Sequence, residues 1–142
     1  MKYKFSEQSL KNLEGVHPSL VKVVHAVMAL QIMDFRVAEG LRDLKTQEEY
    51  VKKGVSKTLK SKHLIQPDGF CHAIDLYPSP IDMKAVKAGV AKEIARFALL
   101  AGCMLSVSKL QGVVLVWGGD WNGNGETMDQ GFIDMPHMQI EI

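Results

Sequence analysis

Cys71-His72-Ala73-Ile74-Asp75-Leu76-Tyr77 is a short apolar stretch with a carboxylate near its centre. Pro78-Ser79-Pro80 follows at once, so the pattern predicts a strand over residues 72–77 that ends at these prolines. Asp75 has an aliphatic neighbour on each side, and an unpaired charge in such surroundings is costly to bury. Asp75 therefore needs a partner from elsewhere in the chain.

The candidate partners of Asp75 are histidines on either side of this strand. His63 precedes Asp75 by twelve positions, and Asp134-Met135-Pro136-His137 places a further acid three residues before another histidine. Two histidines and one carboxylate form an open zinc site with a position left for water, and an additional acid can move protons during hydrolysis. Spacing alone leaves unrelated polar residues as the other explanation. His17 and His25 lack an acidic or thiol neighbour in sequence and are expected to be ordinary surface or core residues.

The remaining segments predict an α+β arrangement around this strand. Apolar residues at helical spacing predict a helix after His17-Pro18-Ser19. Thr46 is predicted to cap a helix that ends at Gly54, and residues 83–104 are predicted to form the longest helix. Further strands are expected in three segments: 34–39, 113–117 and 138–142. We expect a single small domain over residues 1–142, with an antiparallel sheet packed by helices.

The overall composition excludes several classes of protein. The 142 residues are 46% hydrophobic and 23% charged, and 17 Lys and Arg against 16 Asp and Glu give a net charge of +1. A nucleic-acid partner is not expected, because phosphate binding needs a strong basic excess. No stretch is apolar enough for a signal peptide or a membrane span, so we expect a protein made in the cytoplasm. Cys71 and Cys103 give no disulfide framework.

The motifs resemble, in their order along the chain, the zinc peptidase family that contains the D-alanyl-D-alanine carboxypeptidases and the L-alanyl-D-glutamate endopeptidases of phage endolysins. The matching segments are Glu39-Gly40-Leu41-Arg42, Ser61-Lys62-His63, Ala73-Ile74-Asp75, Gly119-Asp120-Trp121-Asn122 and Asp134-Met135-Pro136-His137. They cover nearly the whole chain. The resemblance implies the zinc fold of D,D-peptidases and hedgehog-type proteins.

The resemblance also implies a role for each matching residue. One zinc ion would be held by His63, Asp75 and His137. Asp134 would be the general base and acid of the hydrolysis. Arg42 would steady the scissile carbonyl or the oxyanion, and the alternative is a surface arginine after a turn. Ser61 and Trp121 would be substrate-binding residues.

One departure from the family pattern lies between His63 and Asp75. The family has a shorter step with a glycine between the two ligands, and here Cys71 stands near the expected position of that glycine. An insertion at residues 64–70 accounts for the difference, and it makes His72 a rival ligand. Because side chains alternate along a strand, His72 is expected on the face opposite Asp75, which favours His63.

The loop after the predicted strand 113–117 matches the first half of a calcium-binding loop. In this interpretation Asp120, Asn122 and Asn124 would bind Ca²⁺, and the ion would order the loop and so regulate access to the site. Gly131 occupies the position where a bidentate glutamate belongs, so the motif is incomplete. The alternative is a tight glycine-rich loop that lines the cleft.

Five lysines fall within eleven positions: Lys52, Lys53, Lys57, Lys60 and Lys62. Such a run is usually a solvated face. The functional interpretation is attraction to the anionic cell-wall polymer or to the carboxylates of stem peptides.

The leading hypothesis is a zinc-dependent peptidoglycan hydrolase that cleaves the L-Ala-D-Glu bond of the stem peptide, as in a phage or prophage endolysin that lyses its host. The protein would be a monomer, made in the host bacterial cytoplasm without a signal peptide and released to the cell wall through a holin-type pore. The alternatives are a D-Ala-D-Ala carboxypeptidase, which has the same motifs, and a non-catalytic zinc-containing cell-wall binding module. Asp134 argues against the binding module, since a pure binding site needs no base there.

Overall fold

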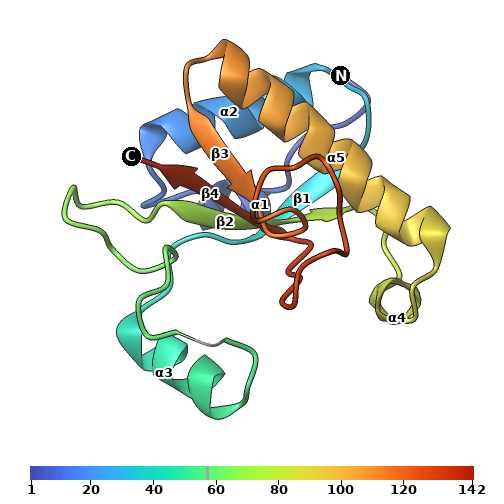
Figure 1. The fold of residues 1–142 in the computed structure, drawn as a ribbon. Coiled ribbons are helices and arrows are strands. Elements are labelled where there is room, and N and C mark those ends of the chain that lie inside the picture. The colour runs from blue at the N-terminus through green and yellow to red at the C-terminus, as the bar shows by residue number, and fades with distance from the viewer. Residues whose placement is uncertain (57) are drawn as a thin grey trace.

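A four-stranded sheet forms the centre of the structure, a computed structural model that describes residues 1–56 and 58–142. Its strands are β1 (Phe35–Glu39), β2 (Ala73–Pro78), β3 (Val114–Trp117) and β4 (His137–Glu141). Their order across the sheet is β1-β2-β4-β3, and every neighbouring pair is antiparallel (Figure 1). The predicted α+β class with an antiparallel sheet is confirmed, and each strand begins within one residue of its predicted start.

Two helices, α2 (Pro18–Ala29) and α5 (Ala91–Leu110), cover one face of the sheet (Figure 1). The strand residues that point toward them are fully buried: Ile74, Leu76, Met138 and Ile140. The helices contribute buried side chains at helical spacing, among them Leu20, Val24, Phe97 and Met104. Because side chains alternate along a strand, the intervening residues of β2 and β4 point to the opposite face.

That opposite face carries a row of polar side chains. The register pairs Glu39 with Asp75 and Asp75 with His137, so the three residues lie side by side across β1, β2 and β4. The row depends on an irregularity between Val37 and Glu39, where two steps along β1 match one step along β2. Without this bulge Ala38 would lie opposite Asp75, so the bulge brings a charged side chain into the row.

The predicted helix over residues 83–104 is wrong, because the segment forms two helices. A short helix, α4 (Met83–Lys87), precedes α5, and residues 88–90 separate them. Gly89 lies in this break with φ of +80°, a left-handed conformation that ends helices and suits glycine. Val90, the next residue, is 45% exposed.

Helix α3 (Leu44–Lys52) lies apart from the sheet at the end of two extended segments (Figure 1). The predicted cap Thr46 is wrong: Asp43 is the N-cap, and its side chain accepts a hydrogen bond from the Thr46 N–H. The only buried residue of α3 is polar, Gln47. The first helix, α1 (Glu7–Asn12), begins at its Ser6 cap and packs beside β1. Among the described residues, no helix combines the length and apolarity needed to cross a membrane.

Candidate metal centre

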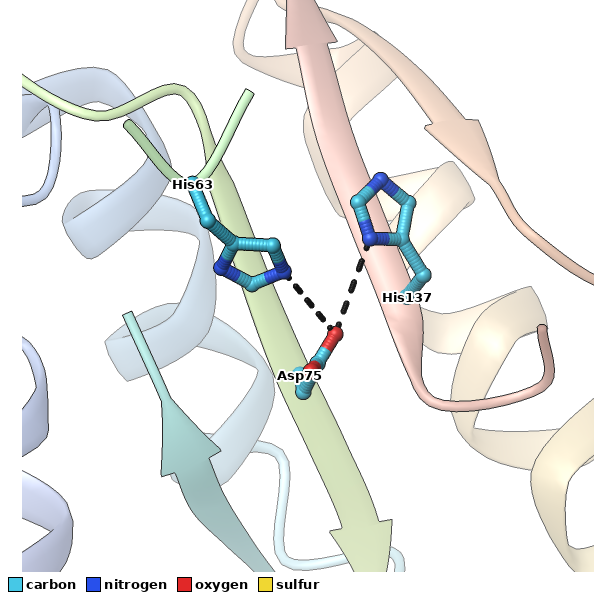
Figure 2. A group of neighbouring side chains, drawn as sticks. All are labelled: His63, Asp75 and His137. Atoms are coloured by element: carbon cyan, nitrogen blue, oxygen red, sulfur yellow. Dashed lines mark hydrogen bonds and ion pairs between the residues drawn. The ribbon is translucent and has the colours of Figure 1, made fainter. Parts of the chain in front are cut away.

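His63, Asp75 and His137 converge on the polar face of the sheet (Figure 2). The Nε2 of His63 lies 3.2 Å from Oδ1 of Asp75, and Nδ1 of His137 lies 3.6 Å from the same oxygen. One ligand atom from each residue lies within 4.8 Å of the other two, and within the described part of the chain no other group of His, Cys, Asp or Glu meets this condition. The three residues that the sequence singled out are therefore brought together.

Backbone contacts hold His63, which comes from a loop outside the sheet. Its N–H donates to Oγ of Ser61 at 3.1 Å, and its carbonyl accepts from the N–H of Arg42 at 2.9 Å. The ring Nδ1 lies 2.8 Å from the carbonyl oxygen of Gly40. A carbonyl only accepts, so Nδ1 carries the proton, and Nε2 presents its lone pair toward Asp75.

His137 is oriented by Gln139, which follows two positions later on the same face of β4. The ring Nε2 lies 2.8 Å from Oε1 of Gln139, and the amide nitrogen of Gln139 donates to Oε1 of Glu141 at 2.7 Å. Nε2 is therefore the protonated nitrogen, and Nδ1 faces Asp75. Sequence analysis missed Gln139, although its two-residue spacing from His137 on a strand was the available signal.

This arrangement fits a bound cation. With the ring protons assigned to Gly40 and Gln139, two imidazole lone pairs and one carboxylate oxygen point at one another. Such a cluster is unfavourable unless a proton or a metal ion lies among the three atoms. Two imidazoles with one carboxylate, leaving a fourth position open, is a donor set typical of catalytic zinc.

The charges of the cluster are strongly coupled. Burial alone would raise the pKa of Asp75, but hydrogen bonds with His137 and His63 outweigh burial and hold that pKa well below its usual range. Burial alone would lower the pKa of His137, but hydrogen bonds with Asp75 and Gln139 raise it. Asp75 is thus the anionic centre on which both rings depend.

Asp134 lies in the turn that leads into β4. Its N–H donates to the carbonyl of Gly118 at 2.9 Å, and its own carbonyl accepts from the N–H of His137 at 3.1 Å. This turn explains the three-residue spacing between Asp134 and His137. Burial and the nearby charge of Asp75 raise the pKa of Asp134. A carboxyl group with a raised pKa beside a metal site is suited to accepting and releasing protons.

Arg42 is not the surface arginine that the alternative interpretation supposed, since its side chain is only 8% exposed. Its Nε and Nη2 donate to the two carboxylate oxygens of Glu39 at 2.5 and 2.9 Å, and its Nη1 donates to Oε1 of Gln47 at 2.6 Å. Nη2 also lies 4.0 Å from Oδ2 of Asp75. The guanidinium is a fixed cation at the edge of the cluster, stacked over the ring of Tyr50.

A cavity of about 780 Å³ opens over the cluster, and Arg42, Ser61, Trp121 and Asp134 all line it. The Trp121 ring lies 5.2 Å from the His137 ring, centroid to centroid, and stacks on Phe132. Ser61 is buried at the cavity wall, where its hydroxyl accepts from the backbone of His63. Both predicted substrate-binding residues thus reach the cavity, and Ser61 also orders the loop that carries His63.

The loop with the incomplete calcium motif uses its side-chain oxygens within itself. Asp120 accepts from the N–H groups of Asn124 and Gly125, and Asn122 accepts from Asn124 as well. The side-chain oxygen of Asn124 accepts from the N–H of Glu126. These are the contacts of a tight glycine-rich loop, and calcium binding stays a prediction.

His72 lies outside the cluster. Its Nε2 lies 2.7 Å from Oδ2 of Asp68, a residue of the segment 64–70 that departs from the family pattern. Asp68 also lies 3.6 Å from Nε2 of His17, so that histidine has an acidic neighbour that its sequence context did not reveal. His25 contacts the ring of Phe5.

Comparisons with known proteins agree with this geometry. The family model described as phage L-alanyl-D-glutamate peptidase matches residues 1–141. The L-alanyl-D-glutamate peptidase of Escherichia phage T5 is 28% identical over 149 residues, which cover 99% of each chain. The crystal structure of the Serratia marcescens L-Ala D-Glu endopeptidase ChiX superposes with a TM-score of 0.72 at 31% identity, over 97% of this chain and 90% of that one. The chain belongs to the phage L-alanyl-D-glutamate peptidase family.

Proposed function

We propose that residues 1–142 form a single zinc peptidase domain that hydrolyses the L-alanyl-D-glutamate bond in the stem peptide of peptidoglycan. Family membership supports the bond and the polymer. The observation that carries the metal dependence is the convergence of His63, Asp75 and His137, whose three facing ligand atoms need a cation among them.

In this proposal each polar group of the cavity has one task. His63, Asp75 and His137 would hold a zinc ion, and the ion would supply Lewis acidity for a water molecule and a carbonyl group. Asp134 takes a proton from the attacking water and passes it to the leaving amine, a task that its raised pKa supports. Arg42 faces the negative charge that develops on the carbonyl oxygen, and Glu39 and Gln47 keep its guanidinium in place. Ser61 and Trp121 contact the substrate.

The cellular part of the proposal is that the enzyme is a monomer made in the bacterial cytoplasm and released to the cell wall through a holin-type pore.

Calcium binding by Asp120, Asn122 and Asn124 would order their loop beside Trp121. A calorimetric titration with calcium and a measurement of thermal stability test this binding. The absence of both a binding heat and a change in thermal stability would exclude calcium.

The deciding experiment is digestion of Gram-negative peptidoglycan with the purified protein, with and without a chelator, followed by mass spectrometry. The expected products are glycan strands that retain L-alanine and released peptides that begin with D-glutamate, and the chelator should prevent both. Loss of only a terminal D-alanine would identify a carboxypeptidase. An absence of any cleavage by zinc-loaded protein would leave the binding-module alternative.

A further inference from the structure

Three lysines line the cavity on the side from which His63 comes: Lys53, Lys60 and Lys62. Lys53 and Lys60 are exposed, and Lys62 is half-buried. None of the ion pairs found among the described residues includes any of them. Their positive charges are therefore not neutralised within this part of the protein. Lys57, from the same run, lies outside the described residues.

The acidic side chains that line the same cavity do not offset these charges. Glu39 accepts both hydrogen bonds from Arg42, and Asp75 contacts the two histidines. The third, Asp134, stands next to His137 in the turn before β4. The wall formed by residues 53–56 and 58–62 thus presents unpaired positive charge to the cavity.

The wall near His137 is different in character. Trp121 packs against the His137 ring and stacks on Phe132, and both aromatic residues line the cavity. The sheet order explains the separation, because β2 and β4 lie between β1 and β3, which lead into the two walls. In Figure 1, α3 lies on the side of the sheet opposite α2 and α5. The cleft is therefore basic at one end and aromatic at the other.

The bond assigned under the proposed function is asymmetric in the same way. L-Alanine contributes only a methyl side chain. D-Glutamate has two carboxyl groups, and whichever of them continues the peptide, the other remains as a free carboxylate. The leaving side of the bond is thus anionic and the acyl side is neutral next to the cleavage point.

We propose that Lys53, Lys60 and Lys62 form the subsite for the free carboxylate of the D-glutamyl residue, and that they set the direction in which the substrate lies in the cleft. The leaving side then lies along these three lysines, and the L-alanyl side lies along Trp121 and Phe132. This inference rests on the proposed function and adds to it the residues that distinguish the two sides of the bond. Lys62, the least exposed of the three, contributes most, because a partly desolvated charge is screened least.

Lys87 is another lysine that could meet the carboxylate. This residue lines an adjoining cavity of about 510 Å³ beyond Asp134 and Tyr77. Most of that cavity is apolar, with Met83, Val86 and Ile133 among its lining residues. A free carboxylate would meet one lysine there instead of three, so the wall that carries Lys53, Lys60 and Lys62 is the better match.

The test compares two synthetic peptides that differ in one group. One contains L-Ala-D-Glu with its free carboxylate, and in the other that carboxylate is a carboxamide. The zinc-loaded protein should cleave the first with kcat/KM about tenfold higher, mainly through KM, as expected for an interaction present in both ground state and transition state. Lys62→Gln should reduce this preference to about twofold, and Lys53→Gln and Lys60→Gln should each reduce it by a smaller factor.

Two further variants separate the outcomes. Lys92→Gln, at an exposed position of α5, is the matched control and should retain the full preference, because Lys92 does not line this cavity. Equal cleavage of both peptides by the unaltered protein would overturn the inference while leaving the proposed function intact. Loss of the preference in Lys87→Gln but not in Lys62→Gln would overturn the assignment and place the carboxylate in the adjoining cavity. Failure to cleave either peptide, when the family bond is present in both, would instead count against the proposed function.

Discussion

The two histidines of the cluster offer different nitrogens, and in each case a neighbouring acceptor decides which one. The Gly40 carbonyl holds the proton of His63 on Nδ1, whereas Gln139 holds the proton of His137 on Nε2. The first acceptor belongs to the backbone and no substitution can remove it. The second is a side chain, so the contribution of ring orientation to metal binding can be measured at Gln139 alone.

Replacing Gln139 with leucine should weaken zinc binding by about 10- to 100-fold, since partners of a ligating histidine have effects of this size. The His137 ring would lose the acceptor that fixes its orientation. Competition with a chromophoric chelator measures the change. Glu141→Gln is the control, because Glu141 is exposed and contacts only the far side of the Gln139 amide, and it should bind zinc normally. Unchanged affinity in Gln139→Leu would show that packing alone orients the ring.

Asp134 should separate catalysis from metal binding. Asp134→Asn is expected to lower kcat by about 10²- to 10⁴-fold, the usual contribution of a general base, while the zinc content stays at that of the unaltered protein. The amide can still occupy the turn before His137 but cannot accept a proton. Metal analysis and peptide cleavage on the same sample check both parts. Asp129→Asn, an exposed acid of the preceding loop, should keep full activity. Parallel loss of zinc and cleavage would mean that Asp134 supports the metal instead.

The segment between β3 and β4 positions Asp134 and His137 through a close backbone approach at its start. A Cβ atom on Gly118 would lie 2.2 Å from the carbonyl oxygen of Asp134 and 3.0 Å from Cβ of His137. Neither neighbour can yield without moving, because the first is backbone and the second belongs to the metal cluster. Glycine at this position thus lets the end of β3 pack directly against the turn that carries both residues.

Gly118→Ala should therefore reduce cleavage and zinc affinity together, by displacing the turn that carries Asp134 and His137. The matched control is Gly102→Ala on α5, where a Cβ meets nothing within 4 Å. That control should raise the free energy of unfolding by about 0.5–1 kcal/mol, because alanine is the better helix former. Thermal unfolding and zinc titration distinguish the two variants. Normal zinc affinity in Gly118→Ala would mean that the turn can shift without moving His137.

The sequence predicted those features of the whole molecule that follow from local alternation. The pattern around Asp75 determines which side chains of β2 face the helices and which face the cavity, and the same alternation excluded His72 as a ligand. Features that depend on pairing between distant segments were not predictable. The bulge that places Glu39 opposite Asp75 is set by the register of two strands. The spacing of His137 and Gln139 indicates that both side chains share one face of a strand, but only the side-chain positions show that they hydrogen-bond.

The break at Gly89 shows a different limit of prediction. Apolar spacing runs through residues 83–104 without interruption, and a single glycine is tolerated within many helices. Only the left-handed backbone at Gly89 reveals that it ends α4. Likewise Thr46 is a good capping residue by type, but Asp43 lies one turn earlier and receives the Thr46 N–H.

The metal cluster joins residues from different parts of the chain. His63 comes from a segment outside the sheet, whereas Asp75 and His137 come from adjacent central strands. A ligand that binds only the folded protein stabilises it by about 4 kcal/mol when present at a thousand times its Kd. Removal of zinc should therefore lower the Tm and loosen the segment that contains His63.

The size of this Tm difference should depend on pH. In the metal-free protein, the lowered pKa of Asp75 stabilises the fold at pH values above 3.8, the ordinary pKa of an aspartate. This stabilisation is lost as the pH falls through the pKa that Asp75 has in the folded protein. The raised pKa of His137 stabilises the fold fully at pH values below 6.5, the ordinary pKa of a histidine. This stabilisation is lost as the pH rises through the pKa that His137 has in the folded protein. The fold of the metal-free protein is thus most stable between these two pH limits, where a proton can take the place of the metal ion.

Zinc requires both rings to be unprotonated at the ligating nitrogen, so its contribution grows over the range in which the ion pair of Asp75 and His137 weakens. The Tm difference between zinc-loaded and chelated protein should therefore widen from pH 5.5 to pH 8, a range on either side of the ordinary histidine pKa of about 6.5. Scanning fluorimetry across this range measures it. His25→Gln should show the same widening, since His25 lies away from the cluster, whereas His137→Gln should show almost no difference at any pH. A Tm difference that stays constant or narrows with rising pH would mean that protons and zinc do not compete for the same three atoms.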